Sequence, residues 1–342
     1  MTKTQRVLSK ILLATVLTGG SIYLFAPWEY GLYYLYPLPD SIEAQVDQVP
    51  GQGVDGYLLY VDVAGEAPLS YASGWHNRQA QLPARPDALF KIASIGKLYD
   101  ASAVAKLVAG GKLSLDGTLS EYLPTMAARI QNADRITLRM LVQHRSGIPN
   151  YVEHPDFRWD DPAPNVIEMI LDEPADFEPD AEYSYSNSNY LLLAKIMDEV
   201  LGYPYGKFML DEVTGPLGLE RTYFSMEGFD PRDLMSGYFV DVEADFKDLD
   251  QGYVATAKDV GVFLRALNDG TFFNDEEQAV YESLYELEHT GWVLGYSSIA
   301  RYHADIDAVV IQFTSTTGND IIMLTQIIYN RVLKILRQRL GT

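Results

Sequence analysis

The chain has 342 residues, of which 47% are hydrophobic and 12% aromatic, so it can bury the core of one large or two medium globular domains. Its formal net charge of −21 would repel a phosphate backbone, which excludes nucleic acid as an expected partner. The absence of cysteine excludes a disulfide framework and a thiol nucleophile. The acidic runs show no spacing typical of metal ligands, so we expect neither a metal nor another cofactor.

The N-terminus combines a basic flank with an apolar stretch. Lys3, Arg6 and Lys10 accompany residues 7 to 26, a stretch about as long as the roughly 20 residues of one bilayer span. The positive flank should remain in the cytoplasm. We therefore predict that residues 1 to 27 form a helix that anchors the protein in the cytoplasmic membrane, with the rest on the periplasmic side. Aromatic residues follow where the outer interface would lie: Tyr23, Trp28, Tyr30, Tyr33, Tyr34 and Tyr36.

A cleaved secretory signal is the alternative for the same segment. Thr18 and Gly20 offer a poor small-residue cleavage site, and apolar residues follow them instead of a polar mature start. Under either interpretation the remainder of the chain lies outside the cytoplasm, and a cleaved form would be secreted or periplasmic.

Residues 28 to 53 are predicted to be a linker, because prolines and glycines interrupt them and leave room for one short helix near residues 42 to 48. Strands are then expected at residues 57 to 63 and 69 to 72, separated by a turn. A helical pattern follows Lys97 and ends at Gly110.

Helical patterns dominate from residue 119 to residue 281, and strand patterns return near the C-terminus. The chain ends in a basic amphipathic helix, which could contact a membrane but which we expect to cover a sheet. The four C-terminal strands are predicted at residues 287 to 292, 296 to 302, 308 to 313 and 321 to 327.

This order predicts an α/β (α+β) fold in which an antiparallel sheet, flanked by helices, is assembled from both ends of the chain. The sheet domain would comprise residues 54 to 118 and 282 to 342. An all-helical domain, residues 119 to 281, would be inserted between them.

Ser94 and Lys97 are the first candidate catalytic pair. Three residues apart on a helix, a hydroxyl and an amine share one face. Lys97 can act as a base if an apolar environment lowers its pKa. Taken alone, such a pair more often marks a solvated helix face, but this is the chain's one Ser-x-x-Lys.

Tyr185 and Asn187 form the second candidate group, in a polar run that precedes a helix. A tyrosine beside an ammonium can exchange a proton with the serine or the leaving group, and an amide can fix a substrate carbonyl. The structural alternative is an N-capping loop, which is compatible with function.

His289, Thr290 and Gly291 form the third group, at the edge of a late strand. Thr290 could donate a hydrogen bond to substrate, and Gly291 would let the substrate backbone approach closely. By themselves these residues would indicate only the end of a strand.

Together and in this order, the three motifs resemble the serine β-lactamase and penicillin-binding-protein superfamily. The similarity is greatest to class C β-lactamases and the Streptomyces-type D-alanyl-D-alanine carboxypeptidase. It runs from residue 56 to the C-terminus, and implies a β-lactamase/transpeptidase-like fold with the site between sheet and helical domain. Supporting segments lie at residues 90 to 94, 136 to 149, 216 to 222 and 252 to 259, and His144 falls among them as a framework histidine with its hydrogen bonds satisfied.

The resemblance also implies roles for individual residues. Ser94 would be the acylated nucleophile, and Lys97 and Tyr185 would be the base and acid pair. The oxyanion hole would be the N–H groups of Ser94 and Trp292. Substrate would be bound by Asn187, His289, Thr290 and Gly291.

We therefore expect a serine hydrolase that forms an acyl-enzyme on an amide or ester of a small molecule or peptide, with no obligate protein partner evident. Many relatives carry Lys-Thr-Gly where this chain has His289, and a mostly neutral histidine argues against an efficient β-lactamase. Trp292 replaces a smaller residue and should narrow the cleft. D-alanyl-D-alanine carboxypeptidase and carboxylesterase or amidase activity both remain open.

Two other classes of protein are alternatives. A membrane-tethered penicillin-binding sensor that is acylated without turnover fits the predicted anchor, but Tyr185 supplies deacylation chemistry. An α/β-hydrolase is excluded because residue 92 is isoleucine, so Ser94 lacks the Gly-x-Ser-x-Gly elbow.

Overall fold

The computed structural model describes residues 3–25, 28–250, 252–318 and 321–341. Within them, a six-stranded sheet has the order β3-β2-β1-β10-β9-β8, and each neighbouring pair is antiparallel. Its strands are β1 (Gly56–Val63), β2 (Leu69–Asn77), β3 (Leu82–Pro83), β8 (His289–Val293), β9 (Tyr296–His303) and β10 (Ala308–Thr314). Smaller sheets pair β4 (Phe90–Lys91), β7 (Val254–Ala255) and β5 (Thr222–Tyr223), and β11 (Thr316–Thr317) with β6 (Tyr238–Phe239).

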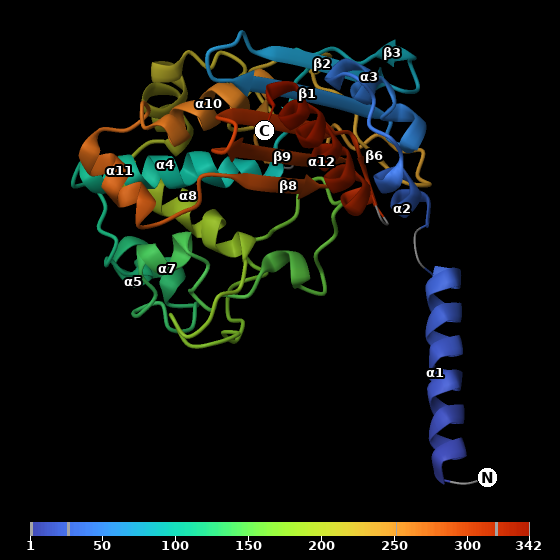
Figure 1. Cartoon of the computed structure of the whole chain (residues 1–342). Helices are drawn as coiled ribbons and strands as arrows, with labels where there is room; N and C mark the ends of the chain where they lie inside the picture. Colours follow the sequence, from blue (N-terminus) through green and yellow to red (C-terminus); the bar gives the residue numbers. More distant parts are fainter. Residues whose placement is uncertain (1–2, 26–27, 251, 319–320, 342) are drawn as a thin grey trace.

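The helices surround the sheet and fill the region below it in Figure 1. They are α1 (Lys3–Phe25), α2 (Trp28–Leu35), α3 (Ile42–Asp47), α4 (Gly96–Ala109), α5 (Leu119–Tyr122), α6 (Pro124–Ala127), α7 (Leu138–Val142), α8 (Asn187–Leu201), α9 (Tyr205–Phe208), α10 (Ala257–Asp269), α11 (Asp275–Glu282) and α12 (Ile321–Leu340). Short turns of 3₁₀ or π geometry are η1 (Pro50–Gln52), η2 (Ala93–Ile95), η3 (Tyr151–Glu153), η4 (Met209–Thr214) and η5 (Gly215–Leu217).

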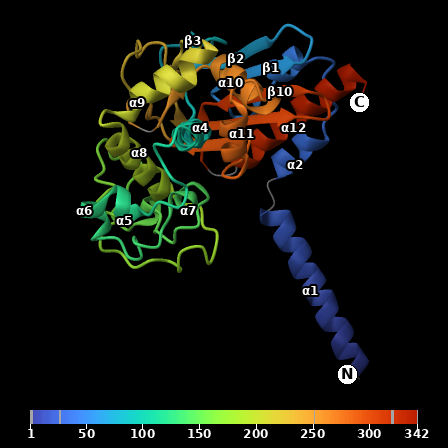
Figure 2. The same cartoon turned by 90° about the vertical axis from the view of Figure 1, so that its left-hand side faces the viewer.

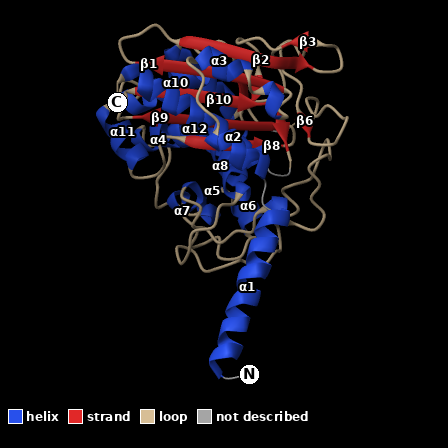
Figure 3. Cartoon of the chain, turned by 45° about the vertical axis from the view of Figure 1, so that its right-hand side comes forward, coloured by secondary structure: helices blue, strands red, loops and turns tan. Residues whose placement is uncertain are grey.

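The central sheet joins the two ends of the chain, as the sequence predicted. β1 pairs with β10 from Tyr57 opposite Thr314 to Val63 opposite Ala308. The remaining strands of the sheet extend from this pair, β2 and β3 on one side and β9 and β8 on the other (Figure 3). The predicted fold class, an antiparallel sheet flanked by helices, is therefore confirmed.

Both faces of β1 are buried, which explains its continuous apolar sequence. Successive side chains of a strand point to opposite faces, so Leu58 and Tyr60 join one core cluster while Tyr57, Leu59 and Val61 join another. α12 covers the second face. α10 covers the first, so closely that a Cβ on Gly261 would come within 2.2 Å of the Tyr60 ring.

The packing of α10 bears on the predicted domain boundary. α10 lies within residues 119 to 281, which the sequence assigned to the helical domain, yet it forms part of the layer that covers the sheet. α5, α7 and α8 lie apart from the sheet, beyond α4 (Figures 1 and 2). We propose that the sheet domain takes in α10, and that α4, buried along most of its length, separates the two regions.

The predicted strand at residues 321 to 327 was wrong, because this segment is the first half of α12. Its run of isoleucine and leucine is compatible with a buried strand or a buried helix face, and periodicity alone cannot separate the two. The expectation that a terminal helix covers the sheet is confirmed: Leu324, Ile328 and Val332 are fully buried in the second core cluster.

The predicted linker is packed against the domain instead of free. Tyr33, Val46 and Val49 are buried in the second core cluster, and the short helix expected near residue 42 is present as α3. Arg331 on α12 is only 1% exposed. Its guanidinium donates hydrogen bonds to the backbone oxygens of Tyr33, Tyr36 and Pro37 and to Oε1 of Gln45, at 2.9 to 3.0 Å.

The predicted membrane span is not supported. Among the helices in the described part of the chain, none is both long and apolar enough to cross a bilayer. The N-terminal segment does form a 23-residue helix, α1, which includes the charged Arg6 and Lys10 and extends away from the rest of the protein (Figure 2). Ala26, the last residue of the predicted span, lies outside the described residues.

Candidate active site

Ser94 lies on the single turn η2, between β4 and the N-terminus of α4. The preceding residue, Ala93, has a φ of 51°, a left-handed conformation that costs energy for a residue with a side chain and that clusters at functional sites. Two contacts hold the turn. The Ile92 N–H donates to the Tyr253 carbonyl at 2.9 Å, and the Ser298 hydroxyl donates to the Ile92 carbonyl at 3.0 Å.

Lys97 lies one helical turn after Ser94 on α4. Its Nζ lies 3.2 Å from Ser94 Oγ and donates to Oδ1 of Asn187 at 2.9 Å. Burial lowers the pKa of Lys97 to about 8, although the charge of Asp100 opposes the shift. A neutral fraction of this amine is thus available near neutral pH, which a base requires.

Tyr185 approaches the same oxygen from the loop before α8. Its hydroxyl donates to Ser94 Oγ at 2.7 Å, and the Lys97 ammonium lies 5.0 Å from the centre of its ring. Burial raises the pKa of Tyr185, while the hydrogen bond to Ser94 opposes the rise. The phenol therefore keeps its proton at neutral pH and can act as a donor.

Asn187 is the first residue of α8 and is held on two sides. Its Oδ1 accepts from Lys97, and its backbone N–H donates to Oδ1 of Asn150 at 3.0 Å. The side chain therefore fixes the position of the lysine. Its predicted role as a substrate-binding amide is a proposal, and Asn150, which the sequence interpretation missed, supports it from behind.

β8 forms the opposite wall, and the predicted binding of substrate by His289, Thr290 and Gly291 stays a proposal. Tyr285 donates to Nε2 of His289 at 3.0 Å and Nδ1 of His289 donates to the Thr290 carbonyl at 2.5 Å, so both ring nitrogens have partners. Burial lowers the pKa of His289 to about 4. His289 is thus a neutral, fully hydrogen-bonded part of the wall.

The space beside Gly291 is filled by the protein itself. A Cβ at this position would lie 2.4 Å from the Ile92 carbonyl oxygen and 2.4 Å from Ser298 Oγ. A side chain is therefore excluded at this position because β8 runs against the turn before the nucleophile, and the predicted approach of substrate to the Gly291 backbone stays a proposal. This contact also brings the backbone of Trp292 beside η2, where an oxyanion hole with Ser94 is proposed.

Trp292 packs against a second tryptophan. Its ring meets Trp159 edge to face, with centroids 5.0 Å apart. Trp159 comes from the region between η3 and α8, and no periodic or motif signal in the sequence pairs it with Trp292.

Asp100 is a buried carboxylate that the sequence interpretation did not single out. Burial raises its pKa to about 7, opposed by a hydrogen bond from Tyr253 and by the charge of Lys97. The hydroxyls of Tyr253 and Tyr205 lie 2.6 Å apart. Because the single hydroxyl hydrogen of Tyr253 is used on Asp100, Tyr205 donates to Tyr253. Gly96 makes room for this chain, since a Cβ there would lie 2.6 Å from the Tyr253 ring.

His144 is not the satisfied framework histidine that we expected. Its φ is 56°, and Nε2 is buried without a hydrogen-bond partner. Its carbonyl accepts from the Ser184 N–H at 3.0 Å, its Nδ1 accepts from the Ser186 N–H at 3.2 Å, and its ring centre lies 4.4 Å from that of Tyr185. His144 thus holds the backbone on both sides of Tyr185.

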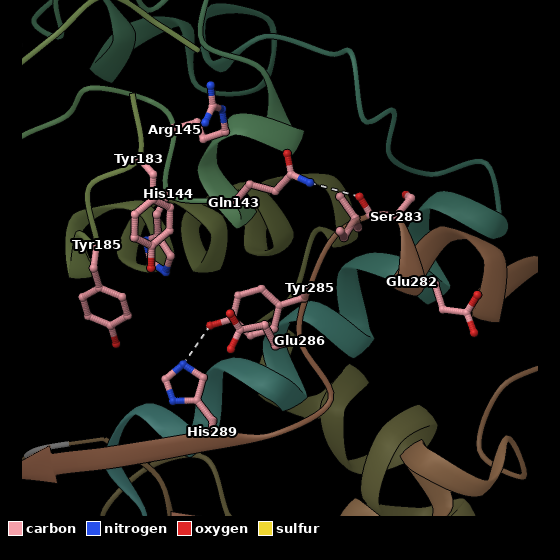
Figure 4. A pocket seen from close by; sticks show the side chains of 11 residues that line it. Gln143, His144, Arg145, Tyr183, Tyr185, Glu282, Ser283, Tyr285, Glu286 and His289 are labelled. Atoms are coloured by element: carbon pink, nitrogen blue, oxygen red, sulfur yellow. Dashed lines mark hydrogen bonds between the residues drawn. The ribbon is translucent and has the colours of Figure 1, made fainter. Parts of the chain in front are cut away.

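A cavity of about 370 Å³ opens beside Tyr185 and His289. Figure 4 shows Tyr285 and His289 joined by their hydrogen bond on its lower side, and His144, Tyr183 and Tyr185 on the other. No cluster of three or more potential metal ligands occurs among the residues that the structure describes.

Comparison with known proteins adds the family. The family model described as Beta-lactamase matches residues 42–295. Penicillin-binding protein 4 of Amycolatopsis lactamdurans is 31% identical over 170 residues, 49% of this chain and 44% of that protein. Penicillin-binding protein 4* of Bacillus subtilis is 25% identical over 190 residues, 53% of this chain and 41% of that protein. The matched region thus spans less than half the length of these relatives.

Solved structures share the fold. D-amino acid amidase from Ochrobactrum anthropi SV3, complexed with L-phenylalanine amide, aligns with a TM-score of 0.76 and 22% identity over 87% of this chain and 98% of that chain. A penicillin binding protein from Bacillus halodurans aligns with a TM-score of 0.70 and 18% identity over 81% of this chain and 96% of that chain.

Proposed function

The chain belongs to the β-lactamase family, and from this we propose that it is a serine hydrolase that forms an acyl-enzyme on an amide or ester. One observation carries the proposal. Ser94 Oγ lies within hydrogen-bond distance of both the Lys97 amine, at 3.2 Å, and the Tyr185 hydroxyl, at 2.7 Å. A nucleophile with a base and an acid on the same oxygen is the arrangement that acyl transfer needs.

The proposed first step uses Lys97 in its neutral form. The amine takes the Ser94 proton as Oγ bonds to the substrate carbonyl carbon, and the N–H groups of Ser94 and Trp292 would stabilise the oxyanion. The bond to the leaving group then breaks, and Tyr185 gives its proton to the departing atom. Lys97 returns a proton to Tyr185, which leaves the acyl-enzyme on Ser94.

The second step releases the acyl group with water. Tyr185 accepts a proton from the attacking water and passes its own proton to the neutral Lys97 amine as the water oxygen bonds to the acyl carbon. Lys97 then returns a proton through Tyr185 to Ser94 Oγ, which leaves. The hydroxyl of Tyr185 is well placed for this step because it already contacts the oxygen that must leave. The observations therefore favour turnover, and none of them favours the sensor that is acylated only once.

The class of substrate follows as a finer proposal. Small amides, esters and peptides with a D-alanine leaving group remain candidates. The neutral state of His289 weighs against β-lactams, whose carboxylate a lysine would bind better. The edge-to-face pair of Trp159 and Trp292 favours slender acyl groups over bulky ones.

A location outside the cytoplasm is also a proposal. The basic and apolar pattern of the first 25 residues supports either export with a cleaved signal or attachment at the membrane. Fractionation of native cells, with N-terminal sequencing of the mature protein, tests it. Full-length protein in the soluble cytoplasmic fraction would contradict both forms.

Two measurements on purified protein test the activity. A serine-reactive phosphonate should add one mass equivalent at Ser94, and Ser94→Ala should abolish labelling and turnover together. p-Nitrophenyl acetate, a chromogenic cephalosporin and an acyl-D-alanyl-D-alanine peptide should be assayed side by side. Labelling at another residue, or full activity in the alanine variant, would remove the assignment of the nucleophile.

A further inference from the structure

The cavity beside Tyr185 has a definite relation to the proposed chemistry. Its wall includes Tyr183, Tyr185, Tyr285 and His289, but the nucleophile, the lysine and Trp292 lie outside the set of lining residues. The cavity therefore opens beside Tyr185, and the groups of the proposed oxyanion hole do not line it.

The position of Tyr185 decides which part of a substrate would enter. In the proposed mechanism this hydroxyl protonates the departing atom, so that atom must come within hydrogen-bond distance of it. The group attached to the departing atom would then extend into the space that Tyr185 lines. The acyl group would lie on the opposite side, with its oxygen toward η2 and β8.

The cationic side chain on the cavity wall is already engaged. Arg145 pairs with Asp180, with Nε 2.5 Å from Oδ1, and also donates to the Asp180 carbonyl. Burial lowers the pKa of His289 to about 4 and that of His144 to about 3, so both are neutral at pH 7. A carboxylate in this cavity would therefore meet no uncommitted cation among the lining residues.

Two carboxylates line the same cavity, Glu282 and Glu286. Glu282 accepts a hydrogen bond from the Gln278 amide at 2.7 Å. The charge of Glu286 acts on two tyrosines of the cavity wall. Burial is the largest cause of the raised pKa of Tyr183 and Glu286 is the second. Glu286 also contributes to the raised pKa of Tyr285. Glu286 follows Tyr285 in the sequence and lines the same cavity, so it adds a negative charge to the aromatic wall.

We propose that this leaving-group cavity accepts uncharged or cationic leaving groups and rejects those that carry a carboxylate. The inference rests on the proposed function and narrows it. Tyrosine rings next to a carboxylate attract ammonium groups, whereas the C-terminal carboxylate of a D-alanine leaving group would be repelled. The substrate is accordingly an amide or ester of an amine or a neutral or cationic alcohol, and not a carboxypeptidase substrate.

Three esters with one acyl group test this directly: 3-(trimethylammonio)phenyl, phenyl and 3-carboxyphenyl butyrate. The kcat/KM of each ester is divided by its rate constant for hydroxide hydrolysis, which removes the difference in intrinsic reactivity. We expect the normalised value for the anionic ester to fall at least about fivefold below that of the neutral ester, the factor that about 1 kcal/mol of charge repulsion at 4 Å in water supplies. The cationic ester should equal or exceed the neutral one. Added salt should shrink the difference.

Charge variants identify the source of the discrimination. Glu286→Gln should raise the normalised kcat/KM of the anionic ester relative to that of the neutral ester about three- to tenfold. Glu286→Lys should raise this ratio further. Glu276→Gln and Glu276→Lys are the matched controls, because Glu276 is an exposed carboxylate on α11 that does not line the cavity. Both control variants should leave the ratio within about twofold of the parent, as expected for a screened surface charge.

The outcomes separate the two proposals. Equal normalised rates for all three esters, or a preference for the anionic one, overturn the selectivity and leave the serine hydrolase standing. The same holds if the Glu286 variants do not change the ratio. If no ester turns over and the phosphonate does not label Ser94, both proposals fail.

Discussion

The hydroxyl of Tyr185 donates a hydrogen bond to Oγ of Ser94 at 2.7 Å, across a separation of 91 residues in the sequence. Ser94 lies on the turn that leads into α4, and Tyr185 on the loop that leads into α8. The contact therefore joins the sheet layer to the helical region at the point where acyl transfer is proposed.

Tyr185→Phe removes the hydroxyl and retains the ring. We expect kcat to fall at least about tenfold, a conservative value for loss of a general acid–base group, whereas one lost hydrogen bond should cost on the order of 1 kcal/mol of stability. Steady-state kinetics and thermal unfolding measure the two effects separately. An ester turned over at the parental rate would leave Lys97 as the sole proton-transfer group.

The pH dependence of kcat/KM should report Lys97. The amine acts as a base only when neutral, and its pKa is lowered to about 8 by burial. The rate should therefore rise with pH and level off above about pH 8, and at pH 6 it should be about one hundredth of the plateau, following the neutral fraction of a single base. A rate that is flat from pH 6 to pH 9 would contradict this role.

Asp100→Asn should move the acid limb of that profile. The carboxylate opposes the lowering of the Lys97 pKa, so its loss should lower the pKa further and shift the limb to lower pH. The change should be seen at about pH 7.5, where Asp100 of the parent is mostly ionised because burial raises its pKa only to about 7: activity there should rise as a fraction of the plateau. Asparagine can still accept the hydrogen bond from Tyr253. An unchanged limb would show that the titrating group does not sense Asp100.

His144→Asn tests whether His144 acts through Tyr185. Asparagine tolerates positive φ and its Oδ1 can replace Nδ1 as acceptor, so the variant removes mainly the ring. We expect a fall in kcat of about tenfold, with little further fall when Tyr185 is already phenylalanine, which corresponds to a coupling of roughly 1.4 kcal/mol in a double-mutant cycle. Independent, multiplicative losses would mean that His144 affects the rate without acting through Tyr185, and an unchanged kcat would mean that it serves stability alone.

Gly291→Ala should be destabilising. The added methyl group would meet the Ile92 carbonyl oxygen at 2.4 Å, and overpacking of this kind typically costs about 1 to 3 kcal/mol. The control is Gly206→Ala on α9, where a Cβ meets nothing within 4 Å and alanine is the better helix former. Thermal unfolding compares the two. Equal melting temperatures would mean that β8 can shift to accommodate the added methyl group without loss of stability.

The sequence predicted the proposed catalytic residues because their spacing is local. Ser94 and Lys97 share one turn of helix, and Tyr185 stands at a helix start, so short motifs were sufficient. Asp100 and His144 were missed or misjudged because their roles depend on burial and on contacts with residues far along the chain, such as Tyr253 and Tyr185. No pattern in one sequence reports burial of that kind.

Fold predictions failed where a pattern fitted two structures. Residues 321 to 327 are apolar enough for a buried strand and for the buried face of α12, and the helix formed. The proline-rich segment from residue 37 looked like a tether because prolines interrupt regular structure. Its few apolar side chains, Val46 and Val49 among them, are nevertheless sufficient to dock it.

The buried guanidinium of Arg331 determines where the chain can be shortened. A truncation that begins at Pro37 would delete the Tyr33 and Tyr36 carbonyls that accept two of its hydrogen bonds. Leaving a buried charge without its partners typically costs roughly 3 to 5 kcal/mol, a large share of the stability of an ordinary domain. A fragment intended for assay or crystallisation should therefore start ahead of Tyr33, so that Arg331 on α12 keeps the backbone carbonyls that accept its hydrogen bonds.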